Sequence, residues 1–297
     1  MIRRFEYTDI LGWSHSRYNT FQTCKRKYYY SYYSRSDERE LQIKLNTLKN
    51  LTTVALEIGN ITHQIISVLL KRMQKTSEPI DTKRFTEFSK RKAREIFDTK
   101  IFQEIYYEER NTIDFEKDIY EPVLKGLTNF LESERLEWLF SEALVNKERW
   151  VIEPEGFGEC RIADMKAYCK VDFLFPVGEE IHVLDWKTGK PNKVNKVKHR
   201  EQLKGYVTWV GFHLDKTYDQ IKPTAAYLLP EYKEVSIDVN EYDIADFADK
   251  IKRQTEDMYE YCSNKLENIP LEKSRFPLTQ NRAICEHCNF RELCDRV

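Results

Sequence analysis

The sequence predicts an α+β fold with more helix than strand. Hydrophobic residues make up 41% of the 297 residues and aromatic residues 13%, so the chain can bury a substantial core. Glycine and proline number nine each, which favours long helices over a turn-rich all-β design. Runs of β-branched and aromatic residues between Lys147 and Lys187 add strands. We expect a mixed sheet flanked by helices, within one unit over residues 1–297.

The first half of the chain is predicted to be helical. Ser14 is the expected N-cap of a helix that ends near Ser34, because aromatic residues recur along this segment. A second helix is expected over residues 61–73, where Ile61 and Ile65 begin an apolar stripe.

Two more helices are expected over about residues 83–104 and 112–143. Both are charged on one side and apolar on the other. We expect residues 75–143 to form a helical subdomain.

The sheet is expected within residues 145–240, a sheet-rich core. Proline- and glycine-containing turns divide this region into short apolar runs. A helix over about residues 198–214 interrupts the strands, and a last helix covers about residues 241–266. The expected strands cover residues 147–152, 157–163, 166–175, 180–187, 224–229 and 232–238.

Charge and cysteine usage limit the class of protein. Lysine plus arginine (48) nearly equals aspartate plus glutamate (49), so net charge neither indicates nor excludes a nucleic-acid partner. No apolar run approaches the roughly 20 residues that span a bilayer, and no signal peptide is recognisable. We expect a cytoplasmic protein without a membrane partner. Seven cysteines in a reducing compartment are better explained by metal binding than by disulfides.

An acidic and lysine constellation carries the chemical prediction. Asp185 and Lys187 alternate along an expected strand, so both side chains lie on one face. A hairpin through residues 176–180 would bring Asp172 beside Asp185. Two carboxylates suit Mg²⁺ or Mn²⁺, and the lysine can orient water and stabilise charge on a phosphate. The alternative, an ordinary solvated pair, is more frequent for such a motif taken alone.

Neighbouring residues strengthen the interpretation of Asp185 and Lys187 as catalytic residues. Gln202 and Tyr206 stand four residues apart and share a helix face, although an amphipathic helix with a polar edge explains them as well. His63 lies within the second helix, where a packing role is more common than metal ligation. Glu148, in the first expected strand, is a weaker candidate for orienting the site.

A run of basic residues follows Lys187. Such a run is usually a solvated face, but beside an acidic metal site it can hold a phosphate backbone. A phosphate-loop motif is absent, which excludes an NTPase motor of that type. The candidate nucleic-acid-binding residues are Lys190, Lys193, Lys196, Lys198 and Arg200.

The cysteines of the tail indicate one metal centre. Cys285, Cys288 and Cys294 lie within ten residues of one another, and Cys24 is the best candidate for a fourth ligand because its segment is polar and basic. Four thiolates can hold a 4Fe–4S cluster or zinc, and His287 can replace one of them in a zinc site. One remote and three local cysteines favour the cluster. Residues 1–34 should then contact residues 276–297.

These motifs together resemble the PD-(D/E)XK nucleases of the RecB and AddB type, especially CRISPR-associated adaptation exonucleases that carry an iron–sulfur cluster. Lys25 stands where the family usually has proline, and residues 73–143 are longer than in compact CRISPR members. The matching motifs, in family order, are Ser14-x-Ser16-x4-Phe21-x2-Cys24-x3-Tyr28, Gly59-x3-His63, Lys170-Val171-Asp172, Asp185-Trp186-Lys187, Gln202-x3-Tyr206 and the terminal cysteines.

The resemblance implies a restriction-endonuclease-like α/β/α core and a role for each motif. Lys187 would be the catalytic lysine, and Gln202 and Tyr206 would contact DNA or position that lysine. The four cysteines would hold the cluster. The implied ligands of the catalytic metal are His63, Asp172, Asp185 and the Trp186 carbonyl.

The implied activity is metal-dependent hydrolysis of DNA, preferentially single-stranded, in repair, recombination or CRISPR adaptation. Two other functions stay open. The chain could be a non-catalytic module that grips DNA ends or braces a helicase or integrase partner. It could also be a zinc-stabilised interaction protein.

Overall fold

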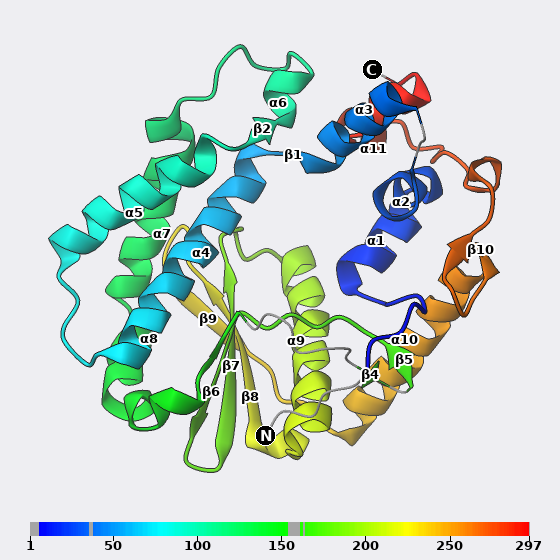
Figure 1. The fold of residues 1–297 in the computed structure, drawn as a ribbon. Coiled ribbons are helices and arrows are strands. Elements are labelled where there is room, and N and C mark those ends of the chain that lie inside the picture. Colours follow the sequence, from blue (N-terminus) through cyan, green and yellow to red (C-terminus); the bar gives the residue numbers. More distant parts are fainter. Residues whose placement is uncertain (1–5, 36–37, 154–160, 163, 297) are drawn as a thin grey trace.

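A five-stranded mixed sheet forms the centre of the computed structural model, which describes residues 6–35, 38–153, 161–162 and 164–296 (Figure 1). The pair β7–β8 is parallel, and the other neighbouring strands are antiparallel. The prediction of an α+β fold with a mixed sheet is therefore confirmed. In spatial order the strands are β3 (Val151–Ile152), β6 (Phe173–Val177), β7 (Glu180–Lys187), β8 (Ile221–Tyr227) and β9 (Lys233–Ser236).

Helices surround this sheet. The longer helices are α1 (His15–Thr23), α2 (Lys25–Tyr32), α3 (Arg39–Asn50), α4 (Val54–Lys75), α5 (Thr82–Phe97), α7 (Glu121–Leu131), α9 (Lys193–Leu214) and α10 (Glu241–Tyr259). Shorter helices are α6 (Gln103–Tyr106), η1 (Phe115–Tyr120), α8 (Glu134–Trp138), η2 (Leu139–Ala143), η3 (Leu144–Arg149), η4 (Tyr218–Gln220), η5 (Lys273–Arg275), α11 (Ala283–Glu286) and η6 (Arg291–Cys294). Two-stranded pairs join β1 (Leu51–Thr52) to β2 (Ile101–Phe102), β4 (Arg161–Ile162) to β5 (Met165–Lys166), and β10 (Cys262–Asn264) to β11 (Ile269–Pro270).

The sheet divides the apolar core into two layers, because successive side chains of a strand point to opposite faces. On β7, Leu184 and Trp186 pack into the core shared with α4, α5 and α7. Ile181 and Val183 pack into the core shared with α1, α9 and α10. The same alternation places Asp185 toward α9, where it contacts Tyr206. In Figure 1, α4 and α9 flank the sheet on either side.

The expected helix from Ser14 to Ser34 is in fact two helices. Ser14 does cap α1, accepting a hydrogen bond from the Arg17 amide. Cys24 then adopts an extended conformation, with φ −161° and ψ 117°, and its sulfur accepts a hydrogen bond from the Lys27 amide at 3.4 Å. The chain turns at this point because Cys24 ends one helix and caps the next.

The helices expected over residues 83–104 and 112–143 are also shorter than predicted. Helix α5 ends at Phe97, and β2 follows it. The second segment divides into η1, α7, α8 and η2. Asp114 caps the start of η1, and Ser133 caps α8 after the interruption at residues 132–133. Side-chain caps of this kind satisfy the free amides at each new helix start.

Other boundaries depart from the prediction. Residues 147–149 lie in η3, so Glu148 is an exposed residue of a helical turn and not of a strand. Asp172 directly precedes β6, and residues 157–160 and 163 lie outside the described residues. Helix α9 begins at Lys193, five residues before its predicted start, and α10 ends at Tyr259, before residue 266. Helix α3 was not predicted.

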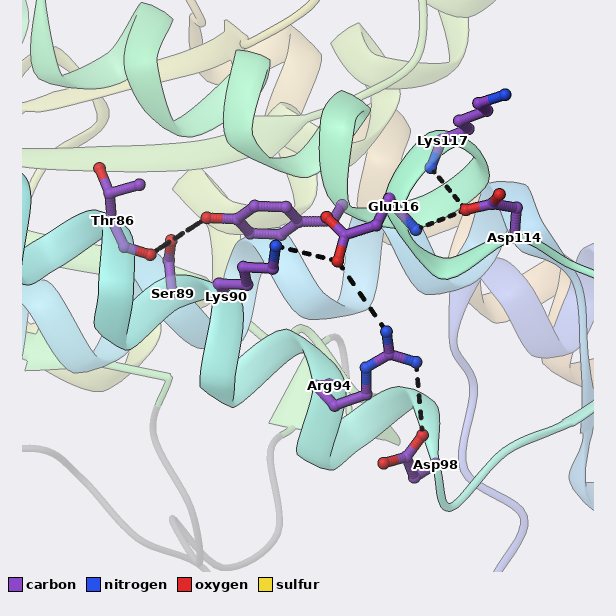
Figure 2. Close-up of polar contacts among 9 residues, drawn as sticks. Thr86, Ser89, Lys90, Arg94, Asp98, Asp114, Glu116 and Lys117 are labelled. Atoms are coloured by element: carbon purple, nitrogen blue, oxygen red, sulfur yellow. Dashed lines mark hydrogen bonds and ion pairs between the residues drawn. The ribbon is translucent and has the colours of Figure 1, made fainter.

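Polar contacts join α5 to η1, as Figure 2 shows. Glu116 forms ion pairs with Lys90 at 2.9 Å and with Arg94 at 3.9 Å. Beneath them, the buried Ser89 hydroxyl lies 3.1 Å from the Tyr120 hydroxyl. These contacts tie α5 to the segment that leads into α7.

The predicted contact between the two ends of the chain is present. On α2, the Arg26 guanidinium donates to the Phe276 carbonyl at 2.8 Å, and the Tyr30 hydroxyl donates to the Leu293 carbonyl at 3.2 Å. The Tyr30 ring also packs against Phe290. Among the described residues, no helix is both long and apolar enough to cross a bilayer.

An ion pair between α8 and β9 gives a test of this packing. Arg135 donates two hydrogen bonds to Glu234, at 2.8 and 2.6 Å. Burial alone would raise the pKa of Glu234, but the hydrogen bonds from Arg135 and Tyr232 lower it. A lowered folded-state pKa means that the stabilisation is present above the unfolded-state pKa and is lost as the pH falls.

We expect Glu234→Gln to lower the free energy of unfolding by about 1–2 kcal/mol at pH 7. Urea unfolding should show the difference from wild type shrinking as the pH drops below the ordinary glutamate value of about 4.3. Glu179→Gln, at a side chain that is 91% exposed, is the control. A difference between wild type and Glu234→Gln that does not change with pH would contradict the assignment.

Candidate active site

The register of the β6–β7 hairpin brings the two predicted aspartates together. Phe173 pairs with Leu184, so Asp172, one residue earlier, lies beside Asp185. The Asp172 carboxylate accepts a hydrogen bond from the Trp186 amide at 3.0 Å. The backbone of β7 therefore holds the side chain of Asp172, which directly precedes β6.

Lys187 joins the same site. Its ammonium forms an ion pair with Asp185 Oδ2 and donates a hydrogen bond to Gln202 Oε1 at 2.8 Å. Asp185 is only 2% exposed. The strand alternation predicted from the sequence thus places a buried carboxylate and an ammonium in direct contact.

Two polar side chains of α9 contact Asp185. The Tyr206 hydroxyl donates to Asp185 Oδ1 at 2.8 Å, and the Gln202 amide donates to the same oxygen at 3.3 Å. Gln202 also donates to the Tyr206 hydroxyl. Both residues of the predicted helical pair therefore contact the carboxylate, and Gln202 bridges it to Lys187.

His63, on α4, reaches the site from the face of the sheet opposite α9. Its Nδ1 lies 3.3 Å from Asp172 Oδ2. Four residues earlier, a Cβ on Gly59 would lie 3.2 Å from the Thr188 hydroxyl, so glycine allows α4 to pack closely against the segment that follows Lys187. The Gly-x3-His spacing thus positions the histidine at the site.

Burial and mutual repulsion set the charges of the two aspartates. Burial raises the pKa of Asp185, and the neighbouring charge of Asp172 raises it further. Burial also opposes ionisation of Asp172, but His63 and the Trp186 amide lower its pKa. The pKa of His63 is raised, since attraction to Asp172 outweighs the effect of its burial. Asp172 is therefore the carboxylate that is held ionised.

The residues present fit a divalent cation that prefers oxygen ligands. Asp185 Oδ2 is buried and has the Lys187 ammonium as its partner, and Asp172 and Asp185 supply carboxylates from β7 and from the residue that precedes β6. Mg²⁺ usually takes one or two protein carboxylates and completes its coordination with water and substrate phosphate. Across the described residues, however, no three His, Cys, Asp or Glu side chains are arranged around a common metal position.

The four cysteines predicted to form a cluster lie in one region. Cys288 interacts electrostatically with Cys24 and Cys285, and Cys294 interacts with Cys24 and Cys288. Burial raises the pKa of the Cys288 and Cys294 thiols. Among the described residues, these cysteines do not form a group of three that could hold a metal ion.

The predicted basic run lies on the loop after β7 and on the first half of α9. Lys190, Lys196, Lys198 and Arg200 are exposed. The Lys193 side chain lies outside the described part of the structure. Exposure alone is consistent with either a solvated face or a phosphate-binding surface.

Sequence reasoning missed a histidine–tyrosine pair beside Lys187. His199 Nδ1 lies 2.6 Å from the Tyr227 hydroxyl, and Tyr227 pairs with Lys187 across the parallel strands. Burial and the nearby charges of Lys187 and Lys198 lower the pKa of His199 to about 4. His199 stands three residues before Gln202 on α9, so helical spacing could have indicated it. The position of Tyr227 beside Lys187 follows only from the pairing of β7 with β8 in the folded structure.

The mixed sheet, paired carboxylates and adjacent lysine define a site suited to phosphodiester hydrolysis. The chain belongs to the PD-(D/E)XK nuclease superfamily, whose family model matches residues 12–295. A comparison with curated proteins found no match.

Ten chains of solved structures match this chain. One, described as "Crystal structure of SSO0001", is 17% identical, and the match covers 64% of this chain and 77% of that chain with a TM-score of 0.28.

The hydrogen bond from Tyr206 can be tested on its own. We expect Tyr206→Phe to lower the free energy of unfolding by about 1–2 kcal/mol, because a buried carboxylate oxygen loses its closest donor. Urea unfolding measures the change, with Tyr242→Phe, at a residue that is 84% exposed, as the control. Equal stability of Tyr206→Phe and wild type would show that this contact does not hold Asp185.

Proposed function

We propose that this protein is a metal-dependent deoxyribonuclease that acts on single-stranded DNA or on single-stranded ends. The observation that carries the proposal is the convergence of Asp172, Asp185 and Lys187 where the start of β6 meets the end of β7. Membership of a nuclease superfamily supports the reaction class. The exposed basic residues beside the site support a nucleic-acid substrate, since cations bind the phosphate backbone independently of base sequence.

Each residue has a proposed role. Asp172 and Asp185 would hold Mg²⁺ or Mn²⁺, with His63 and the Trp186 carbonyl as further candidate ligands. When bound, the ion would polarise the phosphate and lower the pKa of water. Lys187 is placed by Asp185 and by Gln202, at 2.8 Å, to stabilise negative charge that develops on the phosphate. The Tyr206 and Gln202 hydrogen bonds fix the orientation of Asp185.

The four cysteines are proposed to hold a 4Fe–4S cluster. Their support is the contact between α2 and the tail, together with the electrostatic interactions among Cys24, Cys285, Cys288 and Cys294. A cross-link between such remote parts of the chain would stabilise the fold by restricting the unfolded state.

The nuclease proposal is tested with labelled single-stranded DNA and Mg²⁺ or Mn²⁺. We expect cleavage by the wild type, and a loss of roughly 100-fold or more in Asp185→Ala and Lys187→Ala, as for removal of a group that stabilises transition-state charge. Lys222→Ala, an exposed lysine of β8, should keep full activity. Tight DNA binding without cleavage under either metal would instead support a non-catalytic module for DNA ends, such as the subunit of a helicase or integrase complex.

The cluster is tested by anaerobic purification followed by iron, sulfide and zinc analysis. We expect about four irons and four sulfides per chain, and loss of both in Cys288→Ser. Cys262→Ser, outside the proposed ligand set, should retain them. Stoichiometric zinc in a colourless preparation would overturn the cluster and favour a zinc site.

A further inference from the structure

A cavity of 350 Å³ opens beside the proposed catalytic centre. Gln202 and Tyr206, which bond to Asp185, form one end of it. Trp13 and Phe247 also line it, as a buried edge-to-face pair with ring centroids 5.8 Å apart. The volume is near the lower limit of small-ligand sites, which run from about 300 to 1,000 Å³.

An exposed aromatic ring forms one wall of this cavity. Tyr168 is 48% exposed, although the residues on either side of its backbone are firmly held. Its amide donates to the Trp13 carbonyl at 2.7 Å, and the Trp13 amide donates to the Lys166 carbonyl at 2.7 Å. The backbone that carries the ring is therefore anchored to the buried segment around Trp13.

Glycine allows the Tyr168 ring to lie against the backbone. A Cβ on Gly12 would lie 2.2 Å from Tyr168 Cε2, a separation that no real side chain tolerates. The Lys166 ammonium lies 5.8 Å from the centroid of the same ring. Tyr168 is thus supported by close contacts while nearly half of its surface stays open.

Charge around the cavity suits a phosphate chain. Glu201, the acidic residue of the lining, is paired with Lys250 at 2.5 Å and with Lys204 at 3.5 Å. Its charge is therefore largely compensated. The exposed Lys170 and His15 also line the cavity, so cationic and hydrogen-bonding groups surround the aromatic wall.

We propose that this cavity binds one nucleotide of a single DNA strand next to the scissile phosphate, with its base stacked on Tyr168. A base in a duplex is already stacked on its neighbours, so the pocket would select single strands. Stacking on an aromatic side chain is tolerant of base sequence, because each base has an aromatic face. The position of this nucleotide rests on the proposed function, since it assumes that Asp172, Asp185 and Lys187 mark the scissile phosphate.

Fluorescence anisotropy with a labelled single strand, in the presence of a metal chelator, tests the site without cleavage. We expect Tyr168→Ala to weaken binding roughly tenfold, and Tyr168→Phe to stay within about twofold of wild type, because phenylalanine keeps the stacking surface. Tyr242→Ala, which removes a more exposed tyrosine on α10 that does not line the cavity, should bind as wild type. Gly12→Ala, which cannot touch the base, should weaken binding by displacing the ring.

Strands with an abasic nucleotide at each position in turn locate the stacked base. One position should weaken binding to wild type roughly tenfold and have little further effect on Tyr168→Ala. Three results would overturn the inference. Tyr168→Ala could bind with wild-type affinity, or the wild type could fail to bind single strands. The effects of Tyr168→Ala and of the abasic nucleotide could also be fully additive at each position.

The two proposals fail separately. Tyr168-dependent binding without cleavage under Mg²⁺ or Mn²⁺ would remove the nuclease but keep a single-strand binding site. Cleavage that is lost in Asp185→Ala and unaffected by Tyr168→Ala, with unchanged affinity, would keep the nuclease and remove the stacking site.

Discussion

The pairing of Phe173 with Leu184 across the β6–β7 hairpin is the constraint on which the site depends. A shift of one residue would turn Asp185 and Lys187 toward the apolar layer under α4 and α7, because side chains alternate along a strand. The apolar neighbours enforce the register. Leu184 and Trp186 fill one core, and Ile181 and Val183 fill the other. Packing on both faces of β7 therefore fixes where the polar residues lie.

Burying this much charge is unfavourable unless each group is compensated. Asp185 has Lys187, Tyr206 and Gln202 as neighbours, whereas Asp172 has His63 and the Trp186 amide. Burial, and after it the neighbouring charge of Asp172, still raise the pKa of Asp185. A divalent cation would relieve the repulsion between the two carboxylates. In the structure these side chains instead contact one another.

Much of this arrangement could be predicted from the sequence, since it depends on local periodicity. Alternation placed Asp185 beside Lys187, the turn at residues 176–180 brought Asp172 near, and the four-residue spacing joined Gln202 to Tyr206. Helix boundaries were harder. The break at Cys24 and the interruption before α8 coincide with side-chain caps, which compete with continuous helix by small free energies.

Contacts between residues that only the tertiary structure brings together could not be predicted from the sequence. Tyr227 reaches His199 through the parallel pairing of β7 and β8, and Tyr168 reaches Gly12 across 156 positions of sequence. Neither pair has a local signal. The contact between α2 and the tail was predicted, but only because the cysteines suggested a shared centre.

The central claim is that Asp172 and Asp185 share one divalent cation. Crystals soaked in Mn²⁺, with anomalous diffraction recorded near the manganese edge, test it most directly. We expect an anomalous peak in contact with both carboxylates, and its loss in crystals of Asp185→Asn. Full occupancy of manganese elsewhere on the protein, with no peak between these two side chains, would contradict it.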